Sequence, residues 1–350
     1  MASRFSAFVL VSCLVIASSH VHVSSSAHLV KGLSWSFYKN SCPKVESIIR
    51  KHLEKVFEED IGQAAGLLRL HFHDCFVQGC DGSVLLDGSA SEASEQDAAP
   101  NQTLRRTAFK IIDDLRKLLD KKCSRVVSCA DIVALAARDS VFLSGGPEYD
   151  VPLGRRDGLT PATVNVVLEN LPAPTENASE ILAALAKKHL DATDVVALSG
   201  GHTIGRAHCA AFQGRLYPTQ DPTMEEAFAN DLKGVCPTTN STNTTVLDIR
   251  SPNLFDNKYF VNLVNREGLF TSDQDLYEDP TTRDIVTSFA KDRELFFEKF
   301  ILAMTKMGQL ELLTGTKGEI RANCSVTNSE NPDLLASVVE EDLESYAELK

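Results

Sequence analysis

An arginine and a histidine four residues apart are the first candidates for chemistry in this 350-residue chain. Residues 68–83 read Leu-Arg-Leu-His-Phe-His-Asp-Cys-Phe-Val-Gln-Gly-Cys-Asp-Gly-Ser, so Arg69 and His73 share one face of a helix, with Phe72 beside them. An imidazole can accept and return a proton, and a guanidinium can stabilise negative charge that develops next to it. The pattern therefore indicates an acid–base pair with an aromatic neighbour.

The same string continues into a short loop closed by Cys75 and Cys80. Its Asp74, Asp81 and Ser83 carry the oxygen atoms that a hard cation such as Ca²⁺ takes as ligands. The loop is therefore a candidate calcium site that would stiffen the end of the helix carrying the histidine.

Simpler interpretations exist for the parts of this string. Arg-x-x-x-His alone is more often an ordinary helix face, and His-Phe-His could bind zinc. However, His71 and His73 would point roughly 200° apart on a helix, so both cannot easily bind one metal ion. The complete string Arg-Leu-His-Phe-His-Asp-Cys-Phe-Val-x-Gly-Cys-Asp is far more specific, and it resembles the distal haem motif of the secreted plant peroxidases (class III).

A second motif follows about 130 residues later. Residues 194–205 read Asp-Val-Val-Ala-Leu-Ser-Gly-Gly-His-Thr-Ile-Gly and resemble the proximal haem segment of that family, which implies His202 as the axial iron ligand. Gly200 and Gly201 lack a Cβ, so we expect the backbone there to approach a flat ligand closely. Asp273, in Thr-Ser-Asp-Gln-Asp, matches the residue that hydrogen-bonds the proximal histidine.

The resemblance implies a mostly α, two-domain haem peroxidase fold, with one haem b held between distal and proximal halves. His73 would act as general base and then general acid toward hydrogen peroxide, and Arg69 would stabilise the developing charge. Asn101 matches the family's acceptor for the second nitrogen of His73, with Glu95 behind it. Phe72 is expected at the haem.

Two Ca²⁺ ions are also implied, one beside each histidine motif. The expected distal ligands are the side chains of Asp74, Asp81 and Ser83 and the carbonyls of Val77 and Gly79. The expected proximal ligands are the side chains of Thr203, Asp248, Ser251 and Asp256 and the carbonyl of Leu254.

The segment Leu171–Pro174 resembles the family's substrate edge, where the carbonyl of Pro172 faces the bound donor. Family members that bind aromatic donors well can carry phenylalanine and arginine in this region. Here Ala99, Ala210 and Ala211 take the corresponding places, so we expect wide access and weak aromatic stacking.

The N-terminus has the pattern of a secretory signal peptide, expected over residues 1–26. Arg4 precedes a mostly apolar run over 7–17 that is too short to span a bilayer comfortably; a membrane anchor is the alternative. Cys13 would leave with this segment.

Eight cysteines then remain, an even number that suggests four disulfides in a secreted chain. Eight cysteines allow on the order of 100 pairings, and only Cys75–Cys80 is locally persuasive. The resemblance implies the other three pairs: Cys42–Cys123, Cys129–Cys324 and Cys209–Cys236.

Helical periodicity predominates between the motifs. Helices are predicted over 43–58, 62–73, 108–121, 130–141, 181–189 and 293–307. Asp131 is expected to pair with Arg155 or its neighbour. A net charge of −13 makes nucleic acid an unlikely partner on electrostatic grounds.

The resemblance covers residues 33–328, and residues 329–350 form an acidic C-terminal extension, either a vacuolar sorting segment or an inert extension. The predicted protein is a monomeric enzyme of the cell wall or vacuole that reduces hydrogen peroxide and oxidises phenolic donors in one-electron steps, without a membrane partner. The alternatives are a non-catalytic peroxidase fold that binds wall polysaccharide and a calcium-binding scaffold without haem.

Overall fold

The computed structural model describes residues 29–88, 93–331 and Leu334 of the chain. The predicted signal peptide over 1–26 and almost all of the predicted extension over 329–350 lie outside these residues. Within the described part the fold is mainly helical, with one two-stranded sheet. The predicted helical class is therefore confirmed.

The first group of helices comprises α1 (Val45–Glu59), α2 (Gly62–Phe76), α3 (Arg106–Cys123), α4 (Cys129–Leu143) and α5 (Val164–Asn170). The later helices are α6 (Ala178–Ala186), α7 (Ala192–Ser199), α8 (Glu226–Val235), α9 (Lys258–Val264), α10 (Thr271–Glu278), α11 (Arg283–Lys291) and α12 (Arg293–Met307). Short 3₁₀ helices are η1 (Ser83–Leu85), η2 (Glu95–Asp97), η3 (Gly200–Thr203), η4 (Cys209–Ala211) and η5 (Gln213–Arg215). Strands β1 (Arg206–His208) and β2 (Thr244–Val246) pair antiparallel.

Helix α4 is the centre of the first group, because α1, α2 and α3 all pack against it. It is apolar almost all round and nearly every residue is buried, as expected for a helix enclosed by others. Ser128 begins the helix by accepting a hydrogen bond from the backbone N–H of Asp131. The carboxylate of Asp131 in turn pairs with Arg155 at 2.8 Å, which confirms the predicted ion pair.

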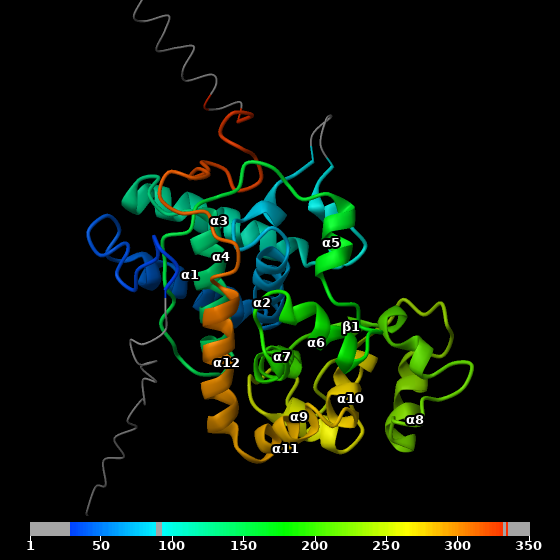
Figure 1. Ribbon diagram of the computed structural model, residues 1–350. Helices are drawn as coiled ribbons and strands as arrows, with labels where there is room; N and C mark the ends of the chain where they lie inside the picture. Colours follow the sequence, from blue (N-terminus) through cyan, green and yellow to red (C-terminus); the bar gives the residue numbers. More distant parts are fainter. Residues whose placement is uncertain (1–28, 89–92, 332–333, 335–350) are drawn as a thin grey trace, which may run out of the picture.

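Phenylalanines form the core between the later helices, which make up the second group. Phe255, Phe260, Phe289, Phe296 and Phe300 contact one another with ring centroids 4.8–5.9 Å apart. Figure 1 shows α3 and α4 in the upper part of the view and α9 and α11 in the lower part. Helix α12 runs from the level of α4 down to that of α11. Helix α12 packs on α7 and α11 and also reaches α2, so it joins the two groups.

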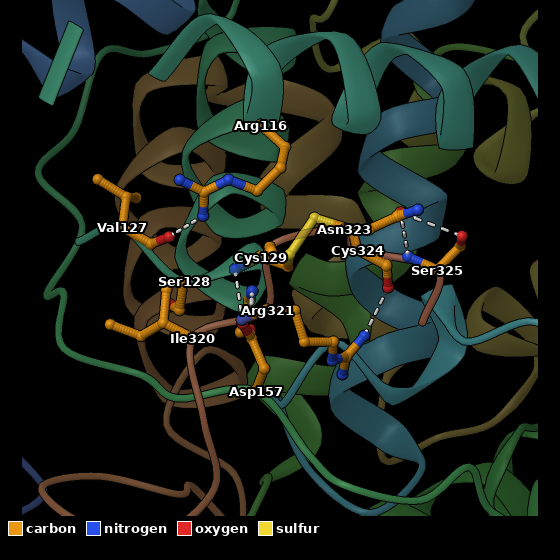
Figure 2. The surroundings of a disulfide bond; sticks show 12 residues. Arg116, Val127, Ser128, Cys129, Asp157, Ile320, Arg321, Asn323, Cys324 and Ser325 are labelled. Atoms are coloured by element: carbon orange, nitrogen blue, oxygen red, sulfur yellow. Dashed lines mark hydrogen bonds between the residues drawn. A yellow bond between two sulfur atoms is a disulfide. The ribbon is translucent and has the colours of Figure 1, made fainter. Parts of the chain in front are cut away.

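The described chain contains four disulfides, and they join the pairs that the resemblance implied: Cys42–Cys123, Cys75–Cys80, Cys129–Cys324 and Cys209–Cys236. Figure 2 shows Cys129–Cys324, which ties the start of α4 to the C-terminal segment. Asp157 accepts hydrogen bonds there from the backbone N–H groups of Ala130 and Arg321. The Arg321 guanidinium also donates to the carbonyl of Asp81, so this junction supports the loop after α2.

Several helix predictions need correction. Helix α6 begins at Ala178 and ends at Ala186, not over 181–189, because Asn177 and Glu180 form a capping box and His189 has a left-handed φ of 60°. The prediction over 293–307 is confirmed by α12, and the ends of the other four predicted helices shift by up to three residues. Helices α5, α7, α8, α9, α10 and α11 were not predicted, because helices of seven to ten residues are too short to show a clear period. No helix in the described ranges is long and apolar enough to cross a membrane.

Candidate active site

Helix α2 brings Arg69 and His73 into direct contact. The Nε–H of Arg69 donates to Nε2 of His73 at 3.1 Å, as the four-residue spacing predicted. The ring of Phe72 lies edge-on to the His73 ring at 5.1 Å and is half-buried. The three residues of the predicted helix face therefore meet in space.

Two carbonyls hold the outer end of the Arg69 guanidinium. Its terminal nitrogens donate to the carbonyl of Thr103 at 3.0 Å and to the carbonyl of Pro100 at 2.9 Å, and also to the Thr103 hydroxyl at 3.0 Å. Burial lowers the pKa of Arg69 to about 10, which still leaves the group charged at neutral pH. These acceptors could not be predicted from the sequence, because a backbone carbonyl leaves no signature in the residue types.

The hydrogen bonds of His73 fix its tautomer. Arginine has no acceptor, so Nε2 of His73 must be the unprotonated nitrogen that receives the Arg69 bond. Asn101 directs its amide nitrogen to the carbonyl of Glu95 at 2.8 Å, which leaves its Oδ1 to accept from Nδ1 of His73 at 2.5 Å. Burial and the positive charge of Arg69 lower the pKa of His73 to about 3, so the ring is neutral and Nε2 is available as a base.

The loop after α2 contains buried oxygen atoms without partners. Both carboxylate oxygens of Asp74 and the hydroxyl of Ser83 have no hydrogen bond among the described residues. Burial raises the pKa of Asp74 well above its ordinary value and that of Asp81 to about 6. Unpaired buried carboxylates are unfavourable without a counter-ion, so this set fits the expected distal Ca²⁺.

The two carbonyls expected at the distal site lie in the same turn. The carbonyl of Gly79 already accepts from the N–H of Asp81 at 2.9 Å, which leaves its second lone pair for a cation. Gly79 has a φ of 95°, and a Cβ there would lie 2.5 Å from the Glu311 carbonyl. Val77 is fully buried beside it.

In the second motif, His202 in η3 is hydrogen-bonded to a buried carboxylate. Its Nδ1 lies 2.7 Å from Oδ1 of Asp273, a residue in the first turn of α10. The side chain of His202 is 40% exposed, and its Nε2 has no hydrogen-bond partner in the described part of the chain. Nε2 is therefore the atom that can bind iron, while Nδ1 is held by Asp273.

A second oxygen cluster lies directly after His202. The hydroxyls of Thr203 and Ser251 each lie within 3.4 Å of both Asp248 and Asp256, with Thr203 and Asp248 fully buried. Two carboxylates that share the same pair of hydroxyls repel each other unless a cation lies between them. The four side chains fit the expected proximal Ca²⁺. The fifth expected ligand is the carbonyl of Leu254, a residue that is 48% exposed.

The two glycines before His202 have different surroundings. A Cβ on Gly200 would lie 2.5 Å from the ring of Phe296, so the phenylalanine core requires a glycine at this position. A Cβ on Gly201 would meet only Leu68 of α2, at an ordinary 3.6 Å. Leu68 of α2 therefore lies next to the turn that carries Gly201 and His202.

The expected donor edge is accessible. Ala99 and Ala210 are exposed, and Pro172 and Ala211 are half-buried.

Several known proteins are similar to this chain over most of its length. The family model described as Peroxidase matches residues 49–292. Peroxidase 12 of Arabidopsis thaliana is 63% identical over 321 residues, which cover 92% of this chain and 89% of that protein. Cationic peroxidase SPC4 of Sorghum bicolor is 57% identical over 317 residues, 89% of this chain and 88% of the relative. Peroxidase 15 of Arabidopsis thaliana is 45% identical over 300 residues, 84% and 88% respectively.

Proposed function

The chain belongs to the plant peroxidases of class III, enzymes that bind one haem and two Ca²⁺ ions, and we propose that Arg69, His73 and Asn101 carry its reaction with hydrogen peroxide. The observation that carries this proposal is the asymmetry of the two histidines. Nε2 of His73 is an unprotonated base beside Arg69, whereas Nδ1 of His202 is tied to a carboxylate. His202 is the residue that would hold the haem iron, and Phe72 would line the haem.

His73 moves the proton. Its Nε2 accepts the proton from one oxygen of hydrogen peroxide and returns it to the other, so that water leaves. Bound haem would supply the two electrons that reduce the peroxide, and two one-electron transfers from donors would then restore the haem. Arg69 holds a fixed positive charge where the leaving oxygen becomes negative. Asn101 keeps Nδ1 protonated, so that Nε2 stays a base.

The donors are phenols, which reach the haem edge past the carbonyl of Pro172 and the small side chains of Ala99, Ala210 and Ala211. A screen of small phenols, hydroxycinnamates and bulky lignin-like phenols with purified enzyme and hydrogen peroxide tests this. We expect turnover of many phenols with high Michaelis constants, because little aromatic surface is offered for stacking. A haem-containing protein that oxidises no phenol would support the non-catalytic wall-binding alternative, and tight selectivity for one hydroxycinnamate would contradict the open edge.

Calcium removal is expected to lower both activity and stability. Asp74 directly follows His73, and Thr203 directly follows His202, so each cation would fix the position of one histidine. A cation at a hundredfold excess over its dissociation constant stabilises the folded state by about 2.7 kcal/mol per site. Melting temperature, haem absorption and guaiacol turnover are measured after prolonged chelation, and the control receives the same chelator saturated with calcium. Unchanged values after verified calcium loss would show that these loops are not calcium sites.

Glycosylation is expected to spare one of the sequons at Asn101, Asn177, Asn240, Asn243 and Asn323. Asn177, Asn240 and Asn243 are exposed, and we expect sugar on Asn177 and on at least one of the other two. Asn101 is 2% exposed, and the amide nitrogen that would carry the glycan donates to Glu95. Peptide mass spectrometry of protein from plant cells checks this. A highly occupied Asn101 in fully active enzyme would refute its role beside His73.

The chain organisation follows from the same proposal. Residues 1–26 direct secretion, residues 33–328 form the haem peroxidase domain, and residues 329–350 are an extension that sends the protein to the vacuole or is inert. The four disulfides support an oxidising compartment. The protein acts as a monomer, which size-exclusion chromatography with light scattering tests.

A further inference from the structure

Tyr259 is a buried tyrosine that contacts the proximal histidine pair. It lies at the second position of α9 and is 2% exposed. Its hydroxyl donates to Oδ1 of Asp273 at 2.9 Å, and its ring lies edge-on to the His202 ring with centroids 6.0 Å apart. Burial and the charge of Asp273 raise the pKa of Tyr259 well above its ordinary value, so the phenol remains a hydrogen-bond donor.

Tyr259 and His202 donate hydrogen bonds to the same oxygen atom of Asp273. Oδ1 of Asp273 accepts from Nδ1 of His202 and from the Tyr259 hydroxyl, while Oδ2 accepts from the N–H of Phe270 at 2.8 Å. Each donor stabilises the anionic carboxylate and makes it a weaker base. The phenol therefore competes with the imidazole for the charge on one oxygen atom.

Helix α9 holds the phenol in a fixed position. Asn262, three residues after Tyr259 and 1% exposed, donates from its amide to Oδ1 of Asp248 at 2.8 Å. The amide oxygen of Asn262 accepts from the guanidinium of Arg250. One short helix thus contacts both the carboxylate of the proximal oxygen cluster and the carboxylate behind His202.

We propose that Tyr259 is a positioning residue that limits how much negative charge Asp273 transfers to the His202 imidazole, and so sets the reduction potential of the haem iron. This inference rests on the proposed role of His202 as axial ligand. A carboxylate that pulls more strongly on the Nδ1 proton makes the imidazole more electron-rich, which favours ferric over ferrous iron. Loss of the phenol hydroxyl should therefore lower the potential.

The test is Tyr259→Phe in the haem- and calcium-loaded enzyme, with Tyr38→Phe as matched control. Tyr38 donates to the buried carboxylate of Asp131 at 2.8 Å, so the control removes an equivalent tyrosine–aspartate bond remote from His202. The two readouts are the ferric/ferrous midpoint potential and the iron–histidine stretching band of the ferrous protein. We expect the ferrous-to-ferric ratio at a fixed potential to fall about three- to tenfold in Tyr259→Phe, where tenfold corresponds to about 59 mV. The stretching band should move to higher frequency, and Tyr38→Phe should match the wild type.

An unchanged potential and band in Tyr259→Phe would overturn this inference while leaving the proposed function intact. Equal shifts in both variants would also overturn it, because the effect would then reflect general loosening of the fold. A wild-type ferrous protein without an iron–histidine band would refute His202 as the ligand, and this inference with it.

Discussion

Replacing His73 with alanine is expected to leave haem bound and to slow the reaction with hydrogen peroxide by about 10⁴-fold or more, because the general base and the general acid are lost together. The measurement is rapid mixing of the haem protein with peroxide, following the change in haem absorption. Haem retention is expected because His202 and Asp273 lie on the other side of the site and are untouched.

His71→Leu is the matched control for this experiment. His71 is a buried imidazole on the same helix, two residues away, whose pKa burial also lowers to about 3. Its ring lies against the Cys75 sulfur, away from Arg69 and Asn101. The control should react with peroxide at the wild-type rate, even if its melting temperature falls. A His73→Ala protein that reacts as fast as wild type would eliminate His73 as the proton carrier.

Arg69→Leu is expected to slow the same step by roughly 10²–10³-fold, the effect of losing one preorganised donor to developing negative charge. The effect is smaller than for His73, because proton transfer remains possible without the guanidinium. Arg69→Lys should recover only part of the rate, since a lysine cannot make the forked bonds to Thr103 and Pro100 that aim the charge.

Arg105→Leu serves as the charge control. Arg105 forms an exposed pair with Asp60 at 2.9 Å, and such pairs contribute about 0–1 kcal/mol to stability. This variant should keep the wild-type rate. If Arg69→Leu and Arg105→Leu slowed peroxide reduction equally, the effect would come from net charge and not from the position of Arg69.

The distal half of the site could be predicted closely from the sequence, because its residues are near one another in the chain. Arg69, His73 and Asp74 lie on one helix, and the loop that follows is closed by a disulfide between cysteines only five residues apart. Local spacing therefore fixes most of their relative positions. Asp273 lies 71 residues from His202 and could be paired with it only through the family resemblance.

Contacts between distant segments could not be derived in this way. Tyr259 and Asn262 lie on α9, a seven-residue helix too short to show a clear period and formed by packing on α11 and η3. Gly200 is a further example, because the ring that requires a glycine there, Phe296, belongs to α12. No pattern of residues near Gly200 in the sequence indicates that contact.

The division of labour between the two histidines is tested most directly by electron paramagnetic resonance of the ferric, haem- and calcium-loaded protein. If His202 alone binds the iron and Nε2 of His73 remains a base, the spectrum is that of high-spin ferric haem with one imidazole ligand. His73→Ala should leave that spectrum high-spin with a histidine ligand, and His202→Ala should remove the histidine ligand. A low-spin, bis-imidazole spectrum in the wild type that His73→Ala converts to high-spin would show that His73 is bound to iron and would contradict its role in proton transfer.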